Sequence, residues 1–285
     1  AADPTCGWGA PSLSCRFGND DGCGDLVLSY GAASTFQLWN VLSSACFAAA
    51  GVPICRGALN GGARRYGAVM CLMAMGAASF HGTAGNTGFL MDMVPMAISG
   101  GMLLHAAIHV LQLHANQRGP DAEFNRFLVS AGSAAFAVWV PWLLIEAGYT
   151  AETTWAVWAV LFGSLGAIFG VVSLLIFCEY SDPSGRVFRD VAQAVVFVVT
   201  GLLVTVHSFV PGLCSGIVAQ LPLHALWHVL SAVSAYKSGC VLDTVLTLTT
   251  AMEARGAEKH RKSGSSLCPL LIRMLKDALP SQFSV

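Results

Sequence analysis

The chain is dominated by stretches of about 20 apolar residues that are separated by short polar connections. Of its 285 residues, 55% are hydrophobic and only 11% are charged, whereas soluble domains carry about 25% charged residues. A helix of about 20 apolar residues spans the hydrocarbon core of a bilayer. Because backbone polar groups inside a bilayer must be satisfied internally, the sequence predicts an all-α, polytopic membrane protein.

Seven stretches meet this length criterion, and we predict a single seven-transmembrane-helix bundle over residues 34–252. No internal repeat or linker divides it. Residues 1–33 form an N-terminal segment, and residues 253–285 form a basic C-terminal tail. The predicted spans are Ser34–Cys55, Arg65–Thr83, Phe89–Leu113, Phe127–Ala147, Thr153–Cys178, Val187–Val210 and Ile217–Leu242.

The distribution of basic residues predicts the orientation of the bundle. Of the 15 Lys and Arg residues, only Arg16 falls on the side of the N-terminal segment. The positive-inside rule therefore places the N-terminus in the lumen and the tail in the cytosol. We expect an ER or Golgi membrane, with the mitochondrial inner membrane, and a tail in the matrix, as the alternative. The net charge of −1 argues against a nucleic-acid partner.

Four polar residues interrupt the apolar spans at one predicted depth. His81 closes the second span, Asp92 opens the third, and His224 and His228 lie near the start of the seventh. Polar groups in a bilayer are costly and usually functional, and residues at i and i+4 stack on one helix face. Three imidazoles are the protein ligands of a catalytic zinc site with an open fourth position. We predict that His81, His224 and His228 bind zinc and that Asp92 acts as the general base.

Other intramembrane histidines receive no such role. His105 and His109 also have i, i+4 spacing, but no carboxylate or third helix is predicted near them. His207 stands alone. We interpret all three as packing or surface residues.

A zinc site at this depth implies hydrolysis of an acyl bond in a lipid that itself lies in the membrane. Water in the open position of zinc has a pKa of about 7 and is a nucleophile at neutral pH. The amide of a ceramide is one such bond, and a lipid ester is another.

The four polar residues lie in three short blocks, Phe80-His81-x-Thr83, Leu90-Met91-Asp92-Met93-Val94-Pro95-Met96 and His224-Ala225-Leu226-Trp227-His228. These blocks resemble the alkaline ceramidase family, within a superfamily of seven-span zinc hydrolases that includes adiponectin-type receptors. The resemblance implies a zinc-dependent amidase that cleaves a ceramide-like membrane lipid to a sphingoid base and a fatty acid. His81, His224 and His228 would be the zinc ligands, and Asp92 the water-activating carboxylate.

One departure from the family bears on catalysis. The family has a serine four residues before the first histidine, and Ala77 occupies that position here. Ser79 is the candidate substitute, but a residue two positions away points about 200° around a helix. Ser79 can serve only if the helix ends or distorts there. A catalytically impaired relative, acting as a structural or lipid-binding subunit with other membrane-protein subunits, is the alternative function; a receptor-like member is a third.

A second departure concerns calcium. The resemblance implies a calcium ion near the membrane surface, but Gln37 stands at the position of a family glutamate that binds it, and this lowers ligand charge. A solvated acidic loop is the preferred interpretation of Asn19, Asp20, Asp21 and Asp25.

Four cysteines fall on the predicted non-cytosolic side, where disulfides persist. The resemblance suggests a bridge from the N-terminal segment to the loop after the sixth span, and we expect Cys23 to pair with Cys214. The other two cysteines on this side are Cys6 and Cys15.

Overall fold

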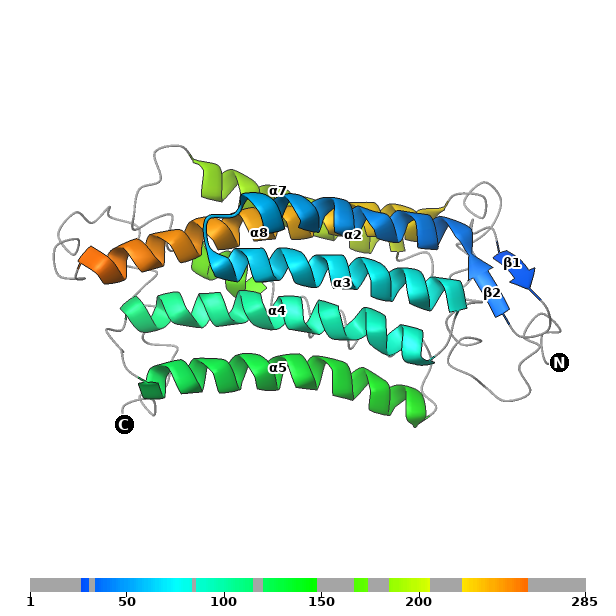
Figure 1. The fold of residues 1–285 in the computed structure, drawn as a ribbon, viewed down its shortest axis with the longest axis horizontal. Coiled ribbons are helices and arrows are strands. Elements are labelled where there is room, and N and C mark those ends of the chain that lie inside the picture. The colour runs from blue at the N-terminus through cyan, green and yellow to red at the C-terminus, as the bar shows by residue number, and fades with distance from the viewer. Residues whose placement is uncertain are drawn as a thin grey trace.

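The computed structural model describes residues 27–30, 34–83, 86–114, 120–147, 167–173, 185–205 and 222–255. Almost all of these residues are helical. The helices lie lengthwise beside one another as a bundle (Figure 1). The labelled helices are α2 (Leu38–Gly57), α3 (Gly61–Thr83), α4 (Asn86–His114), α5 (Pro120–Glu146), α7 (Arg186–Thr205) and α8 (Leu223–Arg255).

A short antiparallel β-ribbon caps one end of the bundle (Figure 1). It consists of β1 (Val27–Tyr30) and β2 (Ser34–Gln37), with Val27 opposite Gln37. The prediction that a helical span begins at Ser34 is therefore wrong, since α2 begins at Leu38. Thr35 and Phe36 favour strands over helices, and pairing with β1 decides the local structure.

Among the described residues, four helical segments are long and apolar enough to cross a membrane, and this fits a membrane protein. The predicted second and fourth spans correspond to α3 and α5, which are not among the four, and only residues 167–173 of the fifth are described. The seven-span arrangement thus stays a prediction. The four segments are Leu38–Gly57, Thr87–Gln112, Arg186–Val204 and Leu223–Ala251.

Helix α3 is rich in glycine and alanine because it packs against α2, α4 and α8. A Cβ atom at Gly51 of α2 would lie 2.5 Å from the carbonyl oxygen of Gly67 in α3, and a Cβ at Gly67 would lie 2.7 Å from that of Gly51. The two backbones therefore touch, which is how small residues pack transmembrane helices.

Helix α8 extends to Arg255, past the predicted end of its span at Leu242. The helix continues because Val241, Leu242 and Val245 are buried in the main hydrophobic cluster. Beside them, the Asp243 carboxylate accepts hydrogen bonds from the backbone N–H groups of Leu59 (3.1 Å) and Asn60 (2.7 Å). These bonds hold α8 against the turn between α2 and α3.

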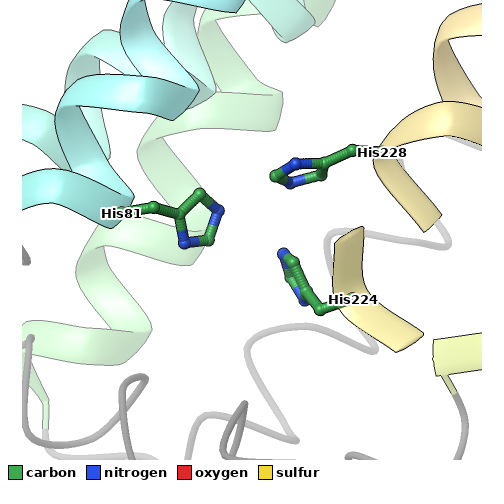
Figure 2. A group of neighbouring side chains, drawn as sticks. All are labelled: His81, His224 and His228. Carbon is green, nitrogen blue, oxygen red and sulfur yellow. The ribbon is translucent and has the colours of Figure 1, made fainter. Parts of the chain in front are cut away.

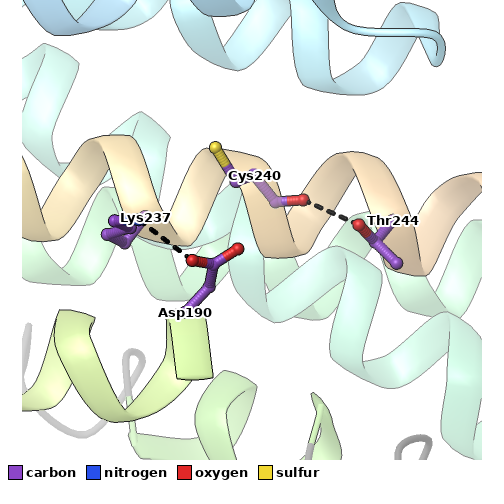
Figure 3. Close-up of polar contacts among 4 residues, drawn as sticks. All are labelled: Asp190, Lys237, Cys240 and Thr244. Atoms are coloured by element: carbon purple, nitrogen blue, oxygen red, sulfur yellow. Dashed lines mark hydrogen bonds and ion pairs between the residues drawn. The ribbon is translucent and has the colours of Figure 1, made fainter. Parts of the chain in front are cut away.

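An ion pair joins α7 to α8 (Figure 3). The Nζ atom of Lys237 lies 3.0 Å from Oδ1 of Asp190, and the two side chains are 25% and 10% exposed. Two turns further along α8, the Thr244 hydroxyl donates to the carbonyl oxygen of Cys240 within the helix. Charged residues inside membrane helices are rare and are usually paired with one another. The Asp190–Lys237 pair therefore links α7 to the helix that carries His224 and His228.

Breaking this pair should destabilise the protein more than replacing both partners. Asp190→Asn leaves the Lys237 ammonium without its counter-charge, whereas Asp190→Leu combined with Lys237→Met removes both charges. A fully buried pair costs about 3–5 kcal/mol to break. We expect a smaller loss of stability here because Lys237 is partly exposed. Thermal unfolding in detergent, followed by tryptophan fluorescence, should rank wild type and the double variant above Asp190→Asn; equal unfolding temperatures would contradict this role.

Candidate metal centre

Three histidines from two helices meet at the end of the bundle that carries the β-ribbon. His81 lies near the end of α3, and His224 and His228 lie in the first two turns of α8. Their possible metal-ligand atoms all lie within 4.8 Å of one another. Figure 2 shows the rings turned toward a common space. The structure thus brings together the three residues predicted as zinc ligands, although 143 positions separate His81 from His224 along the chain.

The cluster is compact and enclosed. The ring centroid of His81 lies 5.0 Å from that of His224 and 5.0 Å from that of His228, and the two α8 rings are 4.8 Å apart. The three residues are only 3%, 8% and 2% exposed. Buried polar groups need partners, and three imidazoles this close cannot all be protonated without mutual repulsion.

The donor set suits a metal ion. Neutral imidazoles offer nitrogen lone pairs, and zinc binds three such ligands in catalytic sites while keeping a fourth position open. Imidazole also suits copper, iron and nickel. The buried group of His81, His224 and His228 could therefore hold a metal ion, and the donor types alone do not select zinc.

Side chains at the start of α2 contact two of the histidines. The Oε1 atom of Gln37 lies 2.5 Å from Nδ1 of His81 and also accepts a hydrogen bond from Asn40 Nδ2 at 3.1 Å. The hydroxyl of Ser43 lies 2.9 Å from Nδ1 of His228. From the sequence, Gln37 was considered only in relation to a calcium ion, and its contact with His81 was not predicted. Polar residues at positions 37, 40 and 43, at the start of an apolar span, were the available signal.

Aromatic rings surround the histidines. Phe80 lies 5.1 Å from His81 between ring centroids, Phe47 lies 5.8 Å from His228, and Trp227 lies 5.5 Å from both His224 and His228. Apolar walls exclude water and lower the local dielectric, which strengthens electrostatic interactions inside the site.

Asp92 stands beside the three-histidine group rather than in it. It is half-buried in the second turn of α4 and interacts electrostatically with His224. A Cβ atom at Gly76 would collide with the carbonyl oxygen of Met91 and lie 2.8 Å from the amide nitrogen of Asp92. The close approach of α3 at Gly76 therefore determines how near Asp92 lies to the histidines.

Ser79 does not lie on the helix face where it could replace the family's serine beside the metal ligands. Helix α3 continues through Ser79 and His81 to Thr83, whose hydroxyl donates to the Ser79 carbonyl at 2.8 Å. Ser79 therefore lies on a different helix face from His81. Ala77, one turn before His81, is 1% exposed and offers no hydroxyl. The Ser43 hydroxyl, on α2, does contact a histidine of the cluster, His228.

Several sequence-based expectations fall outside the described residues. These are the Cys23–Cys214 bridge, the acidic loop at residues 19–25 and the position of His207. His105 and His109 are half-buried in α4, and in the described part of the chain they belong to no group of three potential metal ligands.

Replacing a histidine of the cluster should remove most of the bound metal. We expect wild type, purified without chelators, to carry about one metal ion per chain, because three protein ligands suffice for one catalytic-type zinc. His81→Ala and His228→Ala should lose most of it, since each removes one of three ligands. His105→Ala is the matched control. Elemental analysis by mass spectrometry measures the ratio, and equal metal content in all four proteins would contradict the assignment.

Gly76→Ala should disturb the α3–α4 contact beside Asp92. The added methyl group meets backbone atoms that cannot rotate away, so the helices must separate. Gly132→Ala in α5 is the control, because a Cβ there meets nothing within 4 Å, and alanine is favoured over glycine in a helix by about 1 kcal/mol. We expect Gly76→Ala to lower the unfolding temperature and Gly132→Ala to keep or raise it; the reverse order would refute the close contact.

No protein-family model matches this chain, and no curated protein matches it either. The functional inference therefore depends on the short resembling blocks in the sequence and on the site itself. That site consists of three buried histidines, a neighbouring carboxylate and a set of polar contacts from α2. These features together describe a candidate metal centre inside a helical membrane protein.

Proposed function

We propose that this chain is a zinc-dependent intramembrane amidase that hydrolyses ceramide to a sphingoid base and a fatty acid. The observation that carries the proposal is the convergence of His81, His224 and His228 in a buried cluster. Asp92 lies close enough to interact electrostatically with His224. An enclosed His₃ set with a nearby carboxylate matches the composition of a hydrolytic zinc site.

The residues of the chain have separate tasks in this proposal. Bound zinc would polarise the amide carbonyl and supply a water nucleophile at neutral pH. Asp92 accepts the proton of the attacking water as the carbon–oxygen bond forms. It then delivers that proton to the amide nitrogen as the carbon–nitrogen bond breaks. Phe47, Phe80 and Trp227 exclude bulk water and present an apolar wall to a lipid chain.

A membrane lipid is the substrate class that suits the position of the site. The cluster lies between helices of a membrane protein, and α4 and α8, which carry Asp92 and two of the histidines, are both candidate membrane spans. The choice of a ceramide amide over a lipid ester rests on the resemblance to ceramidases, and within that superfamily the Pro95-Met96 pair after Asp92 favours ceramidases over the receptor branch.

The proposed topology has seven spans with a lumenal N-terminus. The basic residues Arg56, Arg64 and Arg186 lie at the ends of α2, α3 and α7 that are remote from the histidine cluster. Under the positive-inside rule this end faces the cytosol, and the site lies in the opposite leaflet. An ER or Golgi membrane is proposed, with the mitochondrial inner membrane as the alternative.

A second candidate function is favoured by the buried Ala77. The position one turn before His81 has no hydroxyl, and the α3 helix turns Ser79 to another face. Loss of one transition-state donor typically costs about 10²–10³ in rate. The same site could then retain a metal and a lipid without turnover, in a structural or lipid-binding subunit of a larger membrane assembly.

Turnover by zinc-loaded wild type decides between the two functions, and Asp92→Asn tests the proposed general base. If the chain is an amidase, zinc-loaded wild type should release fatty acid from ceramide in mixed micelles. Asp92→Asn should lower the rate by about 10²–10⁴, the usual contribution of a general base, with unchanged metal content. His105→Ala is the control. Zinc-loaded wild type that hydrolyses neither ceramides nor lipid esters, but co-purifies with an intact lipid, would reject the amidase and support the subunit.

A further inference from the structure

The junction between β2 and α2 places three polar side chains against the histidine cluster. Gln37 ends β2, and Asn40 and Ser43 lie in the first two turns of α2. Gln37 and Asn40 are 4% and 1% exposed. Buried polar groups are costly unless they are hydrogen-bonded. These side chains therefore need hydrogen-bond partners, and they find them in one another and in the rings of His81 and His228.

The hydrogen bonds of Gln37 determine which nitrogen of His81 carries the proton. Asn40 Nδ2 is a donor, so the Gln37 atom that it contacts at 3.1 Å is the amide oxygen. The same oxygen lies 2.5 Å from His81 Nδ1. Since a carbonyl oxygen can only accept, His81 Nδ1 carries hydrogen and Nε2 keeps the lone pair.

A corresponding chain of bonds acts on His228. The Ser43 hydroxyl donates to the carbonyl oxygen of Asn40 at 3.1 Å. A hydroxyl that gives its one proton to this carbonyl acts as an acceptor toward His228 Nδ1, 2.9 Å away. In that arrangement His228 carries hydrogen on Nδ1 and has its lone pair on Nε2, as His81 does. Asn40 takes part in both arrangements, through its side chain at Gln37 and through its carbonyl group at Ser43.

We propose that Gln37 and Ser43 are positioning residues of the metal centre, joined through Asn40. They accept the Nδ1–H groups of His81 and His228 and so orient Nε2 of both rings toward the metal. This inference rests on the proposed metal-dependent function. It gives Gln37 a different role from the calcium ligand that the resemblance implies at its position.

Gln37 and Ser43 are both uncharged hydrogen-bond acceptors, and this affects how much charge the histidines can donate to a metal. A group that accepts a hydrogen bond from the second ring nitrogen of a metal-binding histidine holds the ring in place and raises its basicity. Loss of such a group typically lowers metal affinity by about 10–100-fold. A carboxylate is the stronger acceptor for a ligand histidine, because charge-assisted hydrogen bonds are about twice as strong as neutral ones. With Gln37 and Ser43 as acceptors, the histidines would donate less charge to a bound metal than they would beside a carboxylate, and the metal would be a stronger Lewis acid.

Metal affinity of full-length variants tests the proposal. Gln37→Leu and Ser43→Ala each remove one acceptor, and we expect each to raise the Kd for Zn²⁺ by about 10–100-fold in chelator competition. Ser44→Ala is the matched control. Its hydroxyl is fully buried on the same helix and donates to the same Asn40 carbonyl at 2.7 Å, but it has no hydrogen bond to a histidine of the cluster. Its Kd should stay within about twofold of wild type.

Conservative replacement separates positioning from general loss of structure. Gln37→Glu keeps an acceptor oxygen and should bind Zn²⁺ at least as tightly as wild type. The absorption spectrum of the Co²⁺-loaded protein should change in Gln37→Leu and Ser43→Ala, because ring orientation alters the ligand field, and should be unchanged in Ser44→Ala. If Gln37→Leu fails to fold, Ser43→Ala against Ser44→Ala decides the question.

Two outcomes overturn the inference in different ways. Wild-type affinity and spectrum in Gln37→Leu or Ser43→Ala, with a metal bound by wild type, would reject the positioning role and leave the proposed metal centre intact. A wild-type chain that binds neither Zn²⁺ nor Co²⁺ would reject the metal centre itself. Failure of ceramide hydrolysis alone would affect neither measurement.

Discussion

The close contact of α3 with its neighbours is the constraint on which the site depends. At Gly51 and Gly67 the backbones of α2 and α3 touch, and at Gly76 α3 meets the backbone of α4 beside Asp92. These contacts leave no room for a side chain, so the end of α3 has one position relative to both helices. Contact with α8 then brings His81 to the two histidines of that helix.

Burial makes the polar part of this arrangement specific. An imidazole in an apolar site needs a partner for each nitrogen that is not engaged with a metal or a neighbouring ring. The start of α2 provides such partners for His81 and His228, and the partners are bonded to one another through Asn40. A ring displaced from the cluster would leave its own buried Nδ1–H group without an acceptor. The same bonds that stabilise the fold therefore also orient the candidate ligands.

The sequence was sufficient to predict the candidate ligands, and insufficient to predict what supports them. Span order and the i, i+4 spacing of His224 and His228 placed three histidines and Asp92 at one depth. The roles of Gln37 and Ser43 depend on contacts across 44 and 185 positions, which no local pattern encodes. The catalytic role of Ser79 required the helix to end or distort near His81, and α3 continues through both residues to Thr83.

The sequence alone determined that the chain is an apolar, helical membrane protein with histidines at the borders of its spans, since composition and periodicity directly reflect the environment of a helix. Only the tertiary structure decided that β2 replaces the first turn of a predicted span, that α8 continues to Arg255 and that α2 contacts the histidines. The physical reason is that strand pairing, helix burial and hydrogen-bond acceptance depend on residues that are distant in the chain and meet only when the bundle has packed.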